Sequence, residues 1–191
     1  MNPIEMLVLL SGPIAVGKTT LRQALMKAHG FEYVQSSAYL IELADSRGAS
    51  TARSNLQELG DELDQATDYK WVLNEVAAPA MAAHPEHRRW LVDAVRKRRQ
   101  VEHFRGEFGR VALHVHLIAP EDVLQRRYES RAVALDTAGG ATPYKLAIEH
   151  PNEVAARALI SMADLVIDTE MTEPRAAAAQ ILASVARRFS P

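Results

Sequence analysis

The sequence has 191 residues, of which 48% are hydrophobic and 24% are charged, and it contains no cysteine. This balance is typical of a globular chain and excludes an intrinsically disordered one, while the length predicts one domain over residues 1–191. The absence of cysteine excludes disulfides, thiolate catalysis, iron–sulfur clusters and cysteine-based zinc sites. The formal net charge of −2 argues against a general binder of nucleic acids or membrane surfaces.

No targeting or membrane-spanning segment is predicted. The apolar stretch 6–10 is too short for the core of a signal peptide, and no segment reaches the roughly 18 uninterrupted apolar residues of a membrane span. We therefore expect a cytoplasmic protein that binds neither nucleic acids nor membranes. The sequence leaves a homodimer open.

Short apolar runs alternate with longer helical patterns, which is typical of βαβ units around a parallel sheet. The run 6–10 is continuously apolar, as in a strand covered on both faces. Apolar residues then recur at helical spacing between Gly17 and Gly30, which predicts a helix that ends at a glycine. The other predicted strands cover residues 31–35, 90–92, 111–118 and 165–167.

Helical patterns fill the intervals between these strands. Pro120 is well placed to open one of these helices, because proline is favoured at the first helical position. Residues 136–142, with two adjacent glycines, are expected to form a mobile loop. The architecture predicted is of the α/β class, a three-layer α/β/α sandwich around a five-stranded parallel sheet. The helices are expected over residues 37–46, 51–65, 68–83, 121–131, a segment ending near 162, and 173–188.

The segment from Gly12 to Thr19 reads Gly-Pro-Ile-Ala-Val-Gly-Lys-Thr and matches the phosphate-loop pattern G-x-x-x-x-G-K-[ST] in full. It lies directly after a buried strand and directly before a helix. In such a loop, backbone N–H groups and the amino end of the helix surround the phosphates of a nucleoside triphosphate. Lys18 is expected to reach the β- and γ-phosphates, and Thr19 to ligate Mg²⁺. The expected ATP-binding residues here are Gly12, Ala15, Val16, Gly17, Lys18, Thr19 and Thr20.

Asp93 ends the third apolar run and is the best candidate for a second metal-binding acid. It is followed by Ala94, whereas motor-type ATPases usually carry a glutamate there to polarise water. No Asn-Lys-x-Asp motif for guanine is present either. These features favour phosphoryl transfer to a small molecule over a motor ATPase or a GTPase. The alternative for Asp93 is the N-cap of a helix, a position that aspartate favours.

Together, these features resemble the nucleoside-monophosphate kinase family, in particular its dephospho-CoA kinase and phage deoxynucleoside-monophosphate kinase branch. Residues 51–60 resemble the R-x-x-L-Q-x-x-G helix that faces the acceptor in that branch, and 91–102 resemble its D-x-x-R…E-V segment. The helix 121–131 resembles the arginine-bearing stretch before a lid. The resemblance implies a P-loop kinase fold with a small lid at about residues 126–145. Residues 150–153 and 163–168 resemble the segment that closes the fold.

Two pairs of polar side chains stand four residues apart and so share a helix face. Arg53 and Gln57 are expected to bind the acceptor together with Arg96, as the resemblance implies. Arg127 and Arg131 are expected to close over the transferring phosphoryl group, and Arg127 also to bind ATP. For each pair the alternative is an ordinary solvated helix face, with acidic residues of the same helix as partners of the arginines.

Two further groups carry weaker signals. Arg98 and Arg99 belong to a dense basic run and are expected to be solvated. His114 and His116 alternate within a predicted strand and so share one face, which leaves a metal pair as a minor interpretation.

The sequence thus predicts an enzyme that moves the γ-phosphoryl group of ATP, with Mg²⁺, to a small acceptor, in the first place a nucleoside monophosphate or a nucleoside. Lys18, Asp93, Arg127 and Arg131 are the expected catalytic residues, and Thr19 and Asp93 the metal ligands. One alternative is a kinase of another metabolite, such as a sugar acid, an antibiotic or a coenzyme precursor. The other is a nucleotide-binding regulatory module with little turnover.

Overall fold

The computed structural model describes residues 4–134 and 142–189, without the side chains of residues 53, 132–134 and 189. The strands that it contains form one parallel sheet in the order β2-β3-β1-β4-β5. The predicted α/β fold with a five-stranded parallel sheet is confirmed. The strands are β1 (Met6–Ser11), β2 (Glu32–Val34), β3 (Arg89–Asp93), β4 (Ala112–Ile118) and β5 (Leu165–Asp168).

The central strand is β1, and every one of its residues is buried. It pairs with β3 on one side and with β4 on the other, so its polar backbone groups are satisfied within the sheet. Its side chains alternate between the two faces, and both faces are covered by helices. This is why the run is continuously apolar in sequence rather than alternating.

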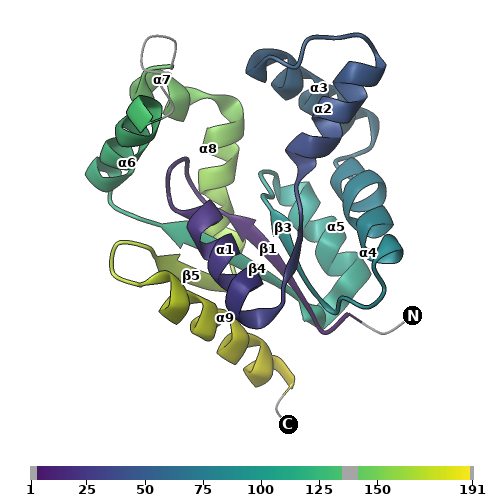
Figure 1. The fold of residues 1–191 in the computed structure, drawn as a ribbon, viewed down its shortest axis with the longest axis vertical. Helices are drawn as coiled ribbons and strands as arrows, with labels where there is room; N and C mark the ends of the chain where they lie inside the picture. Colours follow the sequence, from purple (N-terminus) through teal and green to yellow (C-terminus); the bar gives the residue numbers. More distant parts are fainter. Residues whose placement is uncertain (1–3, 135–141, 190–191) are drawn as a thin grey trace.

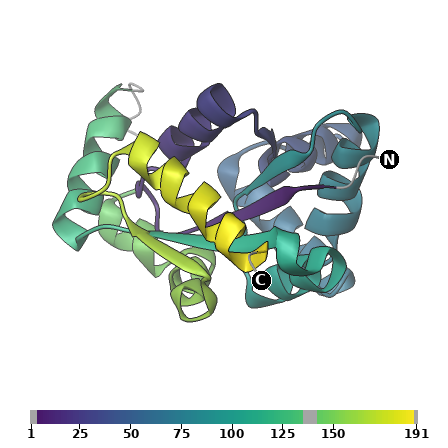
Figure 2. The same ribbon diagram turned by 90° about the horizontal axis from the view of Figure 1, so that it is seen from below.

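Two helices cover one face of the sheet. α1 (Lys18–His29) and α9 (Pro174–Phe189) lie side by side across it (Figures 1 and 2). Their residues Leu25 and Ile181 belong to the same buried cluster as Leu10 of β1. α1 is therefore held against the strand that precedes it.

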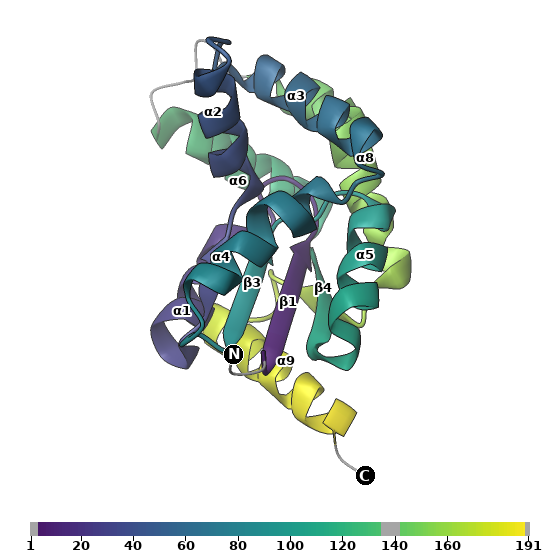
Figure 3. The same ribbon diagram turned by 90° about the vertical axis from the view of Figure 1, so that its right-hand side faces the viewer.

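The opposite face is covered by α5 (Arg98–Phe108) and by the helical segment before β3. Phe104 of α5 is fully buried in the same cluster as Leu9 of β1, and Figure 3 shows α5 beside β1 and β4. The three layers thus follow from the side chains of β1, which alternate between the two faces of the sheet and pack against helices on both.

The helix predicted over 68–83 begins later, at Trp71, because Asp68 and Tyr69 adopt left-handed backbone conformations that a helix excludes. It then runs as a wide π-helical turn (Val72–Ala77) into α4 (Ala78–Ala83). The second residue of α4 is a proline, which has no N–H to continue the ordinary hydrogen-bond ladder.

The helix predicted to end near residue 162 is broken into three pieces, and the prediction of one helix is wrong. α7 (Tyr144–Glu149) stops at His150, which is extended, and α8 (Pro151–Ala158) starts at the next residue. A proline disfavours helical geometry in the residue before it, which explains the break. A short 3₁₀ turn (Leu159–Met162) then leads to β5.

The remaining helices lie close to where they were expected. They are α2 (Ser36–Ser46), α3 (Arg53–Ala66) and α6 (Glu121–Ala134). In Figure 1, α2 and α3 stand on one side above the sheet and α6 and α7 on the other. Residues 136–141 of the expected mobile loop, and so the middle of the expected lid, lie outside the described residues. Within the described ranges, no helix is both long enough and apolar enough to cross a membrane.

Gly12 follows β1 at the point where the chain leaves the sheet. Its φ is +133°, and a Cβ at this position would lie 2.5 Å from the carbonyl oxygen of Leu117 in β4. Only a residue without a side chain fits here, both for the backbone angle and for the space.

We expect Gly12→Ala to lower the free energy of unfolding by roughly 2 kcal/mol or more, because it adds both strain and overlap. Urea unfolding measures this change. Gly106→Ala is the matched control: Gly106 lies in α5 with open space around it, so alanine there should raise stability by about 0.5–1 kcal/mol. Equal effects of the two substitutions on the free energy of unfolding would contradict the conclusion that only glycine fits at position 12.

Candidate active site

The phosphate loop joins the carboxyl end of β1 to α1. Gly17, the N-cap of α1, is left-handed, with φ +97°. No side chain caps this helix and no acidic residue lies in its first turn. The first N–H groups of α1 therefore remain available to an anion, which the helix dipole also favours.

The side chain of Lys18 folds back over the start of the loop. Its Nζ donates to the carbonyl oxygens of Gly12, at 2.7 Å, and of Pro13, at 2.8 Å. Burial lowers the pKa of Lys18 from 10.5 to about 8, and the carboxylate of Glu153 acts in the opposite direction. The other charged groups that act on it are Arg96, Asp93 and Arg131.

A cavity of about 660 Å³ opens beside the loop. It brings together most of the residues predicted to bind ATP, with Arg127 and Arg131 of α6 facing the loop across it. Gly12 does not line the cavity, because it lies buried beneath the loop. The remaining wall comes from the chain after β5. The predicted residues that line the cavity are Ala15, Val16, Gly17, Lys18, Thr19, Thr20, Arg127 and Arg131.

Thr169 connects α6 to the loop and was missed in the sequence analysis. Arg127 donates to its Oγ1, at 3.0 Å, and to its carbonyl oxygen, at 3.1 Å. The Thr169 hydroxyl donates to the carbonyl oxygen of Val16, at 2.8 Å. The available signal was its place directly after β5, since ligands of open α/β sheets bind at the carboxyl ends of the strands.

Asp93 lies at the same edge of the sheet, in register with Leu10 of β1. Its Oδ2 accepts a hydrogen bond from Arg22 at 2.8 Å, and the guanidinium of Arg22 lies over the ring of Tyr33. Asp93 is not the N-cap of α5, because that position belongs to Lys97. The alternative interpretation of Asp93 as a helix cap is therefore wrong.

Mg²⁺ prefers oxygen ligands, and two of the predicted residues offer them at this edge. Thr19 presents an exposed hydroxyl in the first turn of α1, and the carboxylate of Asp93 acts on the neighbouring Lys18. This donor set fits a magnesium ion, with Thr19 and Asp93 as the residues that would hold it.

Among the predicted acceptor residues with described side chains, Gln57 and Arg96 do not line the cavity. Arg96 is exposed, and its backbone N–H donates to Oε1 of Gln100. Gln57 is half-buried on α3, whose first residue is Arg53. The charge of Arg96 acts on Lys18 and lowers its pKa.

Other basic residues are solvated, as expected for Arg98 and Arg99. Arg99 pairs with Asp68, and Arg98 is exposed. Arg126 pairs with Asp122 on the exposed side of α6, so this arginine, unlike Arg127, faces away from the cavity.

Comparison with known sequences agrees with this geometry. The profile of an AAA domain family (AAA_18) matches residues 8–136, which include the phosphate loop, β3, β4 and α6. The chain belongs to this AAA domain family. Among curated protein sequences, none matches the chain.

Solved structures share the fold of this AAA domain. A protein from Chloroflexus aurantiacus proposed to be a kinase has a TM-score of 0.59 at 18% identity, over 99% of this chain and 100% of that chain. An unliganded sugar kinase from Janibacter has a TM-score of 0.54 at 16% identity, over 99% and 100%. Shikimate kinase from Acinetobacter baumannii, in complex with shikimate, has 0.54 at 17%, over 98% and 96%. The AAA domain thus has the fold of these P-loop kinases.

A buried hydrogen-bond chain lies beneath the phosphate loop. Ser11 Oγ lies 2.7 Å from His114 Nε2 and 2.8 Å from His116 Nδ1. Because His114 Nδ1 faces the carbonyl oxygen of Met162, it carries the proton, so Ser11 donates to His114 and accepts from His116. The two imidazoles therefore bind a hydroxyl, and the minor interpretation of a metal pair finds no support.

One cluster in the described part of the AAA domain has the composition of a metal site. It consists of His84, Glu86 and His87, which are exposed or half-buried. It lies before β3, at the amino-terminal edge of the sheet, whereas the phosphate loop lies at the carboxyl edge. Imidazole ligands suit transition metals rather than Mg²⁺, so this cluster is not the magnesium site.

Burial lowers the pKa of both His114 and His116 from 6.5 to about 4. Between pH 6.5 and pH 4 the unfolded chain therefore binds protons that the folded chain does not, and acid should destabilise the fold. We expect the free energy of unfolding to fall by up to about 1.4 kcal/mol per histidine for each pH unit within this window. Urea unfolding from pH 7 to pH 4 measures the slope, and His116→Gln should reduce it. If the pH dependence of the free energy of unfolding is unchanged in His116→Gln, the lowered pKa of His116 is contradicted.

Proposed function

We propose that this AAA domain is a kinase that moves the γ-phosphoryl group of ATP to a small acceptor, in the first place a nucleoside monophosphate or a nucleoside. One observation carries the proposal: charged groups from two separate parts of the chain act on Lys18. Arg131, with Arg127, lines the cavity beside the phosphate loop, which we call the ATP cavity, whereas Arg96 and Asp93 act on Lys18 from the end of β3. We assign the arginines of α6 to the donor side and Arg96 to the acceptor side.

The chemistry requires positioning and charge stabilisation rather than a covalent intermediate. Lys18 would stabilise the transferring phosphoryl group, and Arg127 and Arg131 would neutralise charge that develops on its oxygens. Thr19 and Asp93 would hold Mg²⁺. When bound, this ion neutralises charge on the β- and γ-phosphates.

The environment of Asp93 favours an acceptor that is already ionised. A hydroxyl acceptor needs a base, but protonation of Asp93 would break its ion pair with Arg22, in which both side chains are largely buried. A monophosphate acceptor needs no such base. Its charge would be met by Arg96, and Arg53 and Gln57 of α3 are the further proposed acceptor ligands.

A second candidate is a kinase of a sugar or of a small hydroxylated carboxylic acid. It is supported by the names of two proteins with the same fold, the sugar kinase from Janibacter and the shikimate kinase from Acinetobacter baumannii. The guanidinium of an arginine can bind a carboxylate as well as a phosphate, so Arg96 is compatible with either acceptor.

A coupled assay of ADP release tests the proposal. The acceptor panel should contain ribo- and deoxynucleosides, their monophosphates, dephospho-CoA, gluconate and shikimate, all with MgATP. We expect saturable ADP release with one class, first with monophosphates. Lys18→Met should lower kcat at least a hundredfold, because the cation that meets the transferring group is removed.

The same panel separates the alternatives. Saturable turnover with gluconate or shikimate alone would replace the nucleotide acceptor by a sugar or acid. If ADP release stays at the level of the Lys18→Met blank with every acceptor while ATP still binds, the kinase proposal is wrong and the regulatory module replaces it.

A further inference from the structure

Glu153 reaches the phosphate loop from a distant part of the chain. It belongs to the first turn of α8, and its Oε1 accepts a hydrogen bond of 2.7 Å from the backbone N–H of Ile14. Its side chain is only 14% exposed. The sequence carries no local signal for this contact, since 139 residues separate the partners.

Glu153 and Lys18 bind opposite sides of one peptide unit of the loop. The carbonyl of Pro13 accepts from Lys18 Nζ, while the N–H of the same peptide, that of Ile14, donates to Glu153. This peptide is trans, so its C=O and N–H point in opposite directions. A cation and an anion therefore hold the two ends of one peptide dipole, which fixes the plane of the peptide.

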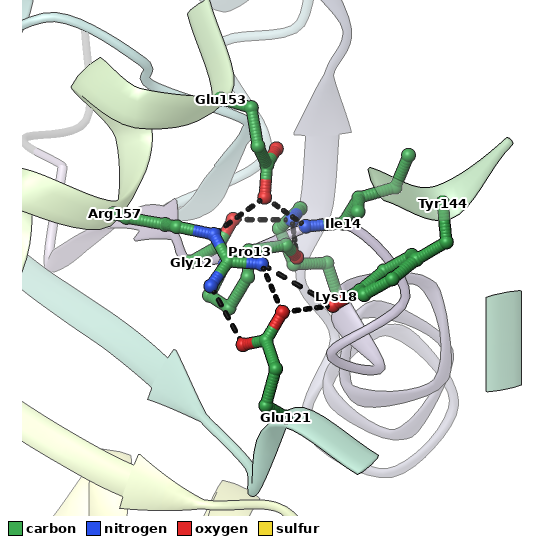
Figure 4. Close-up of polar contacts among 8 residues, drawn as sticks. All are labelled: Gly12, Pro13, Ile14, Lys18, Glu121, Tyr144, Glu153 and Arg157. Atoms are coloured by element: carbon green, nitrogen blue, oxygen red, sulfur yellow. Dashed lines mark hydrogen bonds and ion pairs between the residues drawn. The ribbon is translucent and has the colours of Figure 1, made fainter. Parts of the chain in front are cut away.

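Glu153 is itself held in place by a set of side chains from three helices (Figure 4). Arg157, one turn later on α8, donates from Nε to the same Oε1 at 3.2 Å. Arg157 also pairs with Glu121 at 2.8 Å, and Tyr144 donates to Glu121 at 2.6 Å. Glu121 is the first residue of α6, the helix that carries Arg127 and Arg131.

The carboxylate stands outside the space for the triphosphate. Neither Ile14 nor Glu153 lines the ATP cavity, whose wall within the loop begins at Ala15. Glu153 therefore does not compete with phosphate for the N–H groups of the loop. Its negative charge also supports the protonated form of Lys18 against burial, since it raises the pKa of that lysine.

We infer that Glu153 is a positioning residue of the phosphate loop. It fixes the Pro13–Ile14 peptide, and with it the carbonyl to which Lys18 is bound. Arg157 and Glu121 connect this contact, which we call the Glu153 clamp, to α6. The inference deepens the proposed function and rests on it for its kinetic consequence. A small displacement of a positioned group can cost on the order of a hundredfold in rate.

Two substitutions of Glu153 test whether it acts through its hydrogen bond to the Ile14 N–H. Glu153→Ala removes the acceptor of the Ile14 N–H, and should lower kcat tenfold to a hundredfold with the KM of the acceptor unchanged within threefold. Glu153→Gln keeps an oxygen at the position of Oε1 for both Ile14 and Arg157, and should restore kcat to within threefold of the wild type. Glu149→Ala, an exposed carboxylate on α7, is the matched control and should leave kcat unchanged.

Hydrogen exchange of the Ile14 amide, followed by NMR, measures the clamp without turnover. We expect at least tenfold faster exchange in Glu153→Ala, and wild-type exchange in Glu153→Gln and Glu149→Ala. Wild-type exchange and kcat in Glu153→Ala, or a Glu153→Gln variant as impaired as Glu153→Ala, would overturn the inference. If the wild type turns over no acceptor, the proposed function fails, while the exchange rates still decide whether Glu153 holds the loop.

Discussion

The phosphate loop is organised around one largely buried cation, the ammonium of Lys18, and the backbone that receives it. The ammonium of Lys18 is bound to the first two carbonyl oxygens of the loop that leaves β1. Burial of an ammonium is costly unless its donors are satisfied, so the position of these carbonyls is fixed by the need to hold it. The same ammonium is the group that a polyphosphate would meet first. Stability of the loop and recognition of the anion are therefore set by the same contacts.

The surrounding structure supports those carbonyls from several directions. Below the loop, Ser11 joins β1 to β4 through two neutral histidines. At its start, Gly12 lets the backbone pass within contact of Leu117. Beside it, Thr169 and Glu153 bind its backbone from segments that follow β5 and β4. Each support comes from a different element, which is why an eight-residue loop can keep one shape at the edge of a sheet.

Features with a local cause could be predicted from the sequence. The strands are short and apolar because both faces are covered, and the phosphate loop has a fixed spacing because its own backbone forms the site. The four-residue spacing of Arg127 and Arg131 likewise predicted that they share a face, and both line the cavity. Contacts between distant segments could not be predicted from the sequence in this way. Those of Thr169 with Val16 and of Glu153 with Ile14 depend on how α6, α8 and β5 pack, which no local pattern encodes.

The break before α8 could have been read from the sequence, because Pro151 marks it, and it matters for the site. It turns the chain so that the first turn of α8, with Glu153, faces the loop. The acceptor could not be read in the same way. An arginine binds a phosphate or a carboxylate through the same two-pronged hydrogen bonding, so Arg96 alone does not separate a monophosphate from an organic acid.

The central claim is that the loop from Gly12 to Thr19 binds the phosphates of ATP through its backbone N–H groups. Amide NMR during titration with Mg²⁺ and a non-hydrolysable ATP analogue tests it most directly. The account predicts saturable shifts at Ala15, Gly17 and Thr19, and none of these in Lys18→Met. Unmoved loop resonances at saturating analogue, or shifts confined to residues outside the cavity, would contradict it.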